Sequence, residues 1–170
     1  MKKFVLFLFL MALPFAAGAQ SQQFKFGYFS YQEALKGMPD YAIVQRNLDS
    51  LKDKYAAETK RAEDEFDKKY EEFLDGQRDF APSIRNKRQA ELMELMEKNM
   101  AFKNESLRLL AAADTDAYAP LKSKLAAALQ KIGHDRGYAF IINTDNEAAP
   151  YVDPSMGEDI STIVKDAVAK

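Results

Sequence analysis

Residues 71–88 read EEFLDGQRDFAPSIRNKR, and they hold the only glycine and the only proline between Asp40 and Asp116. Glycine favours the end of a helix, and proline is tolerated in the first turn of the next one. On both sides of this break, apolar residues recur at steps of three and four among dense charges. The stretch therefore predicts the turn of a helical hairpin whose arms, each of roughly 35 residues, would reach about 50 Å.

The apolar stripe of each arm is narrow and flanked by charges, which is typical of a coiled-coil-like pair. In the first arm it comprises Ile43, Val44, Leu48, Leu51, Tyr55, Ala62, Phe66, Tyr70 and Phe73. In the second arm it comprises Ile84, Leu92, Leu95, Met96, Phe102, Leu109 and Leu110. Polar residues Thr59, Glu63 and Asn99 fall on or near the seam. Pro120 predicts an interruption or a kink in the returning helix, because proline lacks the backbone N–H that a helix interior needs.

The segment before the hairpin is aromatic and alternating. Residues 23–30 (QFKFGYFS) predict a strand, since side chains of a strand alternate between two faces. Ser30 and Glu33 form an S-x-x-E capping box, so a short helix should run over residues 31–36 and end at Gly37. Pro39 suits the first turn of the following helix.

The segment after the hairpin predicts more strand and one last helix. Residues 137–143 (GYAFIIN) read as a buried strand, and Tyr151 with Val152 as a short return strand. Pro154 and Ser155 should open the last helix, with Ser155 and Glu158 as its capping box. The apolar face of that helix consists of Ile160, Ile163, Val164, Ala167 and Val168.

These elements predict an α+β fold in which a long antiparallel helical hairpin projects from a small β base. The two ends of the hairpin meet, so the segments before and after it must share that base. We assign residues 20–37 and 119–170 to the base and residues 38–118 to the arm.

Residues 1–19 predict a cleaved signal peptide. Lys2 and Lys3 precede ten unbroken apolar residues, and Ala17 and Ala19 occupy the small-residue positions of a cleavage site. Ten helical residues span only about 15 Å, half of a bilayer core, so a membrane anchor is the weaker interpretation. Removing the segment takes the formal charge from -2 to -4.

Composition excludes much chemistry. The chain has no Cys, a single His (His134), and no G-x-x-x-x-G-K-[ST] phosphate loop. Thiol catalysis, Cys-ligated metals and a His-rich metal site are thereby removed or made improbable. The slight acidic balance argues against nucleic-acid binding. We expect neither an enzyme nor a cofactor or metal, and at most peripheral contact with lipids.

A small sheet and a two-helix hairpin bury little surface, so the base should self-associate. The residues expected at that oligomerisation base are Phe24, Phe26, Tyr28, Phe29, Tyr138, Phe140 and Ile142. Monomeric mass at micromolar concentration would contradict this expectation.

The arms carry two candidate contact surfaces. Candidates for holding an apolar partner chain are Tyr55, Phe66, Tyr70, Phe73, Met93, Met96 and Met100. The three Met recur at i, i+3 and i+7, and flexible thioethers suit promiscuous binding. These side chains could equally pack the arms together, with Leu92, Leu95 and Phe102 as the alternative seam. Arg85, Lys87 and Arg88 are candidates for contact with anions, or a solvated helix face.

Several segments together resemble the Skp/OmpH family of periplasmic chaperones. Near the N-terminus these are residues 26–30 (FGYFS) and 38–41 (MPDY). After the hairpin they are residues 118–121 (YAPL), 137–142 (GYAFII), 153–155 (DPS) and 159–161 (DIS). The match spans essentially the whole chain after the signal segment.

The resemblance implies a periplasmic homotrimer in which strands of three subunits close a small barrel and three hairpins surround a cavity. It implies an ATP-independent holdase that keeps unfolded outer-membrane proteins from aggregating. The charge is a departure, because the best-known relatives are basic. A spacer protein of the cell envelope, with no bound partner, is the alternative function, although such a protein should keep a cleaner heptad seam.

Overall fold

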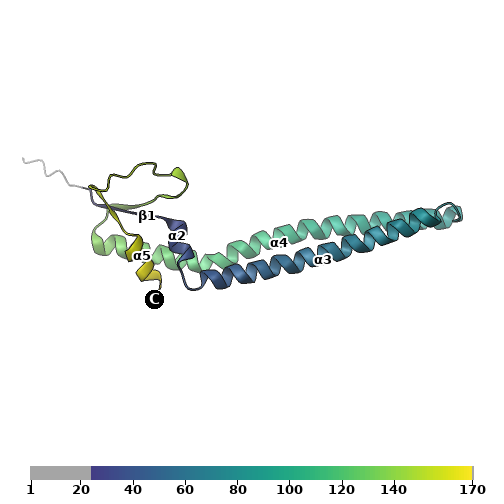
Figure 1. The fold of residues 1–170 in the computed structure, drawn as a ribbon, viewed down its shortest axis with the longest axis horizontal. Helices are drawn as coiled ribbons and strands as arrows, with labels where there is room; N and C mark the ends of the chain where they lie inside the picture. The colour runs from purple at the N-terminus through teal and green to yellow at the C-terminus, as the bar shows by residue number, and fades with distance from the viewer. Residues whose placement is uncertain (1–23, 170) are drawn as a thin grey trace, which may run out of the picture.

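The computed structural model describes residues 24–169, and the predicted signal peptide lies outside them. A hairpin of two long helices projects from a compact base (Figure 1). The elements in chain order are β1 (Phe26–Phe29), α2 (Tyr31–Lys36), α3 (Tyr41–Gly76), α4 (Pro82–Arg136), β2 (Phe140–Asn143), the 3₁₀ turn η2 (Asp145–Glu147), β3 (Gly157–Asp159) and α5 (Ser161–Val168). The predicted long helical hairpin that projects from a small β base is confirmed.

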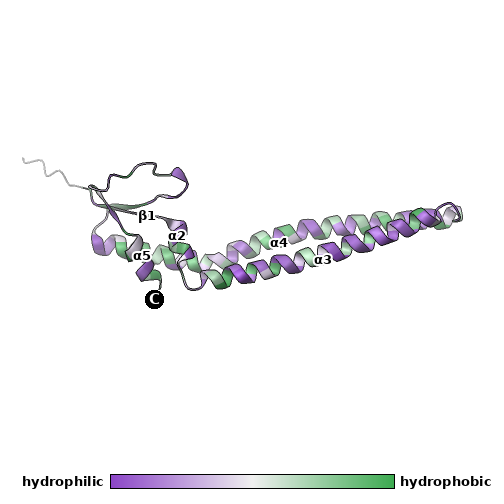
Figure 2. Cartoon of the chain, viewed as in Figure 1, coloured by the Kyte–Doolittle hydropathy of each residue, from purple (hydrophilic) through white to green (hydrophobic). Residues whose placement is uncertain are grey.

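The hairpin turns where the sequence predicts. Helix α3 ends at Gly76 and α4 begins with Pro82 in its first turn. Phe80 fills the turn: its ring centroid lies 6.4 Å from that of Phe73, and the Arg88 guanidinium lies 4.7 Å from it. Hydrophilic residues alternate with hydrophobic ones along both arms (Figure 2).

Helix α4 is longer than the hairpin alone requires. Its 55 residues continue past Pro120 and end at Arg136, and the following Gly137 caps the helix in a left-handed conformation with φ of 66°. The predicted interruption at Pro120 is therefore wrong. The turns beyond it are held by burial, since Leu121, Leu125 and Ile132 all pack into the base, and packing of this kind outweighs one unfavourable residue.

Three parallel strands form the sheet, in the order β2-β1-β3. Phe26 stands opposite Phe140 on one side and Gly157 on the other. Parallel neighbours need crossover connections. The hairpin supplies the first crossover and the loop over residues 144–156 supplies the second.

The third strand is not the one predicted. Tyr151 and Val152 form no strand, and Ser155 does not open a helix. Asp153 instead accepts hydrogen bonds from the backbone N–H and hydroxyl of Ser155, at 2.8 and 2.7 Å, which makes a local turn. The chain then pairs with β1, and α5 starts only at Ser161. Of the two residues of the predicted capping box, Ser155 therefore lies in a turn and Glu158 lies in β3.

Helix α2 matches its prediction residue for residue. Ser30 caps it by accepting a hydrogen bond from the Glu33 N–H at 3.1 Å, and Gly37 follows its end. Pro39 precedes the next helix rather than joining its first turn, because α3 begins at Tyr41.

The core lies between the sheet and helices α2, α4 and α5. It consists of Phe29, Ala34, Met38, Leu121, Leu125, Ile132, Ile160, Val164 and Val168. Phe29, which is predicted at the oligomerisation base, is only 3% exposed and belongs to this core, so the prediction that it offers surface to another subunit is wrong. Residues alternate across a strand, and Phe29 falls on the inner face with Gly27.

The outer face of the sheet carries other aromatics. Phe26 stacks on Phe140, with ring centroids 5.3 Å apart, and Phe140 remains 50% exposed. Figure 1 shows α4 and α5 on one side of the strands and the β2–β3 loop on the other. Among residues 24–169, no helix has the length and hydropathy to cross a membrane.

Candidate functional site

The two arms meet along a thin seam that polar groups interrupt. Leu48 and Leu92 are buried in it, and the rings of Tyr55 and Phe102 lie 6.3 Å apart. The Asn99 amide donates a hydrogen bond across the seam to the Ala62 carbonyl, at 2.9 Å. A polar residue in the seam of two packed helices helps to fix their register, and it makes the helix pair less stable than an apolar residue would.

The four candidate aromatic residues of the first arm differ in how they lie relative to this seam. Tyr55, Phe66 and Phe73 are half-buried between the arms, whereas Tyr70 is exposed. Phe66 and Tyr70 stack within α3, with centroids 5.9 Å apart. The first three therefore contribute mainly to packing, and Tyr70 remains available to a partner.

The predicted Met positions are exposed rather than buried in the seam, and Met96 and Met100 lie at its edge. Met93, Met96 and Met100 are 54%, 45% and 59% exposed, and we call them the Met stripe. The exposed Leu107 follows Met100 by seven residues and so extends the same helix face. The stripe is therefore a row of exposed apolar side chains on an arm whose surface also carries many charged residues.

A groove of about 210 Å³, which we call the Met groove, runs beside the stripe. Its lining residues are Thr59, Ala62, Glu63, Phe66, Asp67, Met96, Asn99, Met100, Phe102 and Lys103. Lys103 and Glu63 pair across the arms at 3.6 Å and flank it. The groove has an apolar floor and a charged rim, the arrangement that suits an extended apolar segment.

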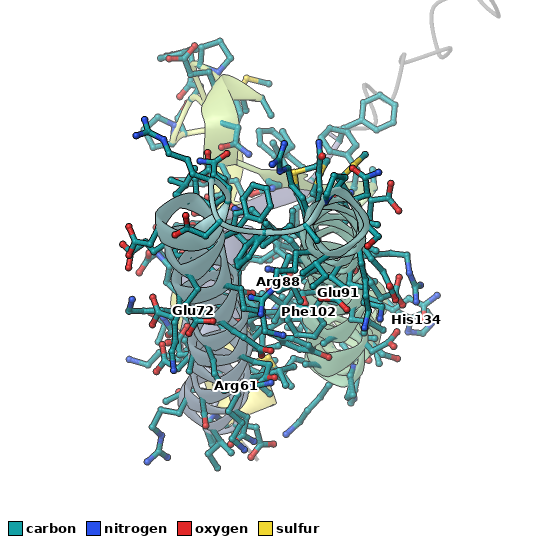
Figure 3. The ribbon with its side chains drawn as sticks, turned by 90° about the vertical axis from the view of Figure 1, so that its right-hand side faces the viewer. Arg61, Glu72, Arg88, Glu91, Phe102 and His134 are labelled. Atoms are coloured by element: carbon teal, nitrogen blue, oxygen red, sulfur yellow. The ribbon has the colours of Figure 1, made fainter. Side chains whose placement is uncertain are left out.

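A larger groove of about 620 Å³ lies nearer the turn. Its lining residues are Lys69, Glu72, Phe73, Ile84, Lys87, Arg88, Glu91, Leu92, Glu94, Leu95 and Lys98. Arg88 and Glu91 lie toward the space between the arms in Figure 3. Sequence reasoning missed this groove, since only the packing shows that Ile84 stays exposed beside the turn.

All three residues of the predicted anionic-contact cluster are exposed. Lys87 pairs with Glu91 at 3.6 Å, and Arg88 stacks on Phe80. Arg85 lies close to the backbone, with its guanidinium 3.5 Å from the Phe80 carbonyl. The three basic groups are therefore exposed, and each has one contact within the chain.

The ionisable groups of the arms are paired along the helix surface. A hydrogen bond from Lys98 lowers the pKa of Glu94, and one from Arg108 lowers that of Glu105. Both pairs are open to solvent, the usual state of helix-surface ion pairs. His134 points outward from the far side of α4 (Figure 3). Within residues 24–169, no cluster of acidic or His side chains could hold a metal ion.

The base supplies a second candidate surface. Of the residues predicted to mediate oligomerisation, Phe24 and Phe140 are exposed, and Phe26, Tyr28, Tyr138 and Ile142 are half-buried. Burial raises the pKa of Tyr138 to about 12. Strands β2 and β3 are the edges of the sheet, so each presents unpaired backbone groups to a neighbour.

Comparison with known proteins identifies a family. The family described as outer membrane protein (OmpH-like) matches residues 25–168, which covers both the base and the arms. No curated protein matches the chain. The family supports a periplasmic, chaperone-type role in general. A long helical hairpin on a three-stranded base, matched over nearly every described residue, shows that the chain belongs to the OmpH-like (Skp/OmpH) family.

Proposed function

We propose that this protein is an ATP-independent holdase of the periplasm that binds unfolded outer-membrane proteins between its arms and prevents their aggregation. The observation that carries the proposal is the Met stripe, an exposed apolar surface on a projecting, charged hairpin. Thioether side chains adapt to many shapes, which a binder of unfolded segments needs. Membership of the OmpH-like family supports outer-membrane proteins as the clients.

The contacts proposed for the client are the Met stripe, the exposed Tyr70 and the floor of the Met groove. Phe66 and Phe102 form part of that floor, so seam aromatics could meet a client at their exposed edges. The acidic charge of the chain leaves apolar contact as the main attraction. We therefore expect client binding to depend only weakly on salt.

The base is proposed to join three subunits. Phe24 and Phe140 leave apolar surface uncovered, and both sheet edges are free to pair within the described chain. Closing a sheet removes such edges. Three hairpins held at one end would then surround a space for the client.

The test is suppression of aggregation. A β-barrel membrane protein is diluted from urea with stoichiometric chaperone and without ATP, and light scattering is followed. We expect the mature protein to suppress scattering, and replacement of all three Met-stripe residues by Glu to abolish most of the effect. A matched variant places Glu at the exposed Ala90, Ala101 and Ala112 of the same helix and should retain it.

The alternative, an envelope spacer without a client, predicts no suppression by any variant. The polar seam argues against it, because a pure spacer gains from continuous apolar packing along its length. If the variant with Glu at all three Met-stripe positions suppresses aggregation as well as the parent protein does, the stripe does not bind the client.

A further inference from the structure

The sulfur atoms of this chain are unevenly distributed. The sequence contains no Cys, so thioethers are its only sulfur nucleophiles. Four of the five Met among residues 24–169 are exposed: the three of the Met stripe, and Met156 in the loop before β3, at 58%. The fifth, Met38, is 4% exposed in the core of the base.

The exposed sulfurs are concentrated where the proposed function needs apolar surface. Met96 and Met100 line the Met groove with Phe66 and Phe102, and Met93 extends the same helix face toward the turn. No thiol of this chain can intercept an oxidant before it reaches them. Oxidation of Met follows exposure, so the stripe should react early while the core sulfur is protected.

We propose that the Met stripe is an oxidation-sensitive switch of client holding. A hypohalous acid such as hypochlorous acid transfers one oxygen to each thioether. The sulfur is oxidised by two electrons to the sulfoxide, chlorine is reduced to chloride, and a proton is released to water. A reductase that delivers two electrons and two protons returns the thioether and water. The switch rests on the holdase proposal above.

The physical consequence follows from where the oxygen is placed. A sulfoxide is polar and accepts hydrogen bonds from water, so the oxidised stripe loses its preference for apolar segments. The fold should persist, because the stripe side chains are exposed rather than buried in the seam and Met38 is protected in the core. Oxidation would thus change the binding surface without unfolding the protein that carries it.

The first experiment measures the modification alone. The mature protein is treated with a limiting dose of hypochlorous acid, and peptide mass spectrometry gives the sulfoxide fraction at each Met. We expect the three stripe residues and Met156 to be oxidised roughly tenfold more than Met38 at the same dose. Equal oxidation of Met38, or a stripe that stays reduced, overturns the proposal.

The second experiment connects the modification to holding. Oxidised parent protein should lose most of its suppression of client aggregation and regain it after treatment with methionine sulfoxide reductase. Replacing Met93, Met96 and Met100 by Leu removes the sulfurs at similar apolar volume, so the suppression that this variant shows before treatment, measured against its own untreated sample, should not fall after exposure to the oxidant. The matched Met156→Leu variant should lose activity as the parent does.

The outcomes separate the two proposals. If the unoxidised protein suppresses no aggregation, the holdase proposal fails and the switch fails with it. If the unoxidised protein holds clients and the oxidised protein holds them equally well, only the switch is overturned. Loss of activity in the oxidised Leu variant equal to that of the parent would assign the effect to other residues. Circular dichroism of each sample shows whether the helices survive.

Discussion

At the scale of single residues, the base depends on a few completely buried side chains. Leu125 is fully buried, together with Ile160, Val164 and Val168. A small domain has few such residues, so each one is a large part of its stability. The arm contributes less, because most of its side chains face solvent.

Leu125→Ala should lower the free energy of unfolding by about 2–5 kcal/mol, since it opens a cavity that the surrounding helices cannot fill. The matched change Leu107→Ala, at an exposed position of the same helix, should stay within about 0.5 kcal/mol of the parent protein. Urea unfolding at one fixed protein concentration measures both. Equal effects of the two changes would mean that the base is not the stable part of the molecule.

Asp145 ties the loop after β2 to the start of α2. It accepts hydrogen bonds from the Ser30 hydroxyl at 2.6 Å and from the Gln32 N–H at 2.8 Å. The Ser30 bond is the main reason that the pKa of Asp145 lies below its ordinary value of 3.8. The carboxylate therefore stabilises the fold above that value, and its contribution is lost as the pH falls through the lowered pKa.

Asp145→Asn should lower stability by about 1 kcal/mol at pH 7, because a charged acceptor is replaced by a weaker one. The difference between the variant and the parent should shrink as the pH falls below 3.8 toward the native pKa. Thermal midpoints at pH 7, 4 and about 2.5 provide the measurement. A gap that widens in acid would contradict this account of the pKa.

At the scale of elements, the arm combines local helix propensity with a weak seam. The seam buries only a narrow stripe, and Asn99 interrupts it with a side-chain bond to Ala62. Pro120 stands within α4 and removes one helical hydrogen bond. The helix continues because the next turns are fixed by the base, so the long arm and the base are parts of one continuous element.

We propose the basic residues that follow the turn of the hairpin as a contact for an anionic surface. Replacing Arg85, Lys87 and Arg88 by Gln should weaken binding to phosphatidylglycerol vesicles by about tenfold or more, since each basic residue near such a surface contributes roughly 1 kcal/mol. The control makes the same charge change at Lys122, Lys124 and Lys131 near the base. Vesicle co-sedimentation at two salt concentrations compares the two variants. If both weaken binding equally, the basic cluster near the turn makes no specific contact and is only a solvated helix face.

At the scale of the whole molecule, an exposed aromatic face and free edges favour assembly through the base. Phe140→Glu places a charge on the outer face beside Phe26, where an interface would exclude water. We expect the parent to sediment as a trimer at micromolar concentration and the variant as a monomer.

Tyr151→Glu, in the exposed β2–β3 loop, serves as the control and should leave the mass unchanged. Analytical ultracentrifugation gives the mass, and circular dichroism confirms that each variant is folded. A monomeric parent protein would show that the base does not assemble. A Phe140→Glu variant that still assembles would show that the interface lies elsewhere.

Local signals in the chain were enough to predict the hairpin. The Gly76–Pro82 break, the Ser30 cap and the three- and four-residue apolar spacing act over a few residues, so they can be read without knowing the packing. The same periodicity placed the three Met on one helix face but left open whether that face packs against the other arm. The resemblance to the Skp/OmpH family, confirmed by the family match, added the role.

The tertiary structure was needed wherever two segments of the chain could have filled the same place in the fold. Gly157–Asp159 rather than Tyr151–Val152 pairs with β1, because pairing depends on which segment reaches the sheet edge. Burial in the base, not local propensity, carries α4 past Pro120. The strand's pleat turned Phe29 inward, and helix geometry left the Met stripe exposed rather than buried in the seam. Such outcomes depend on contacts between residues far apart in sequence, and periodicity does not encode them.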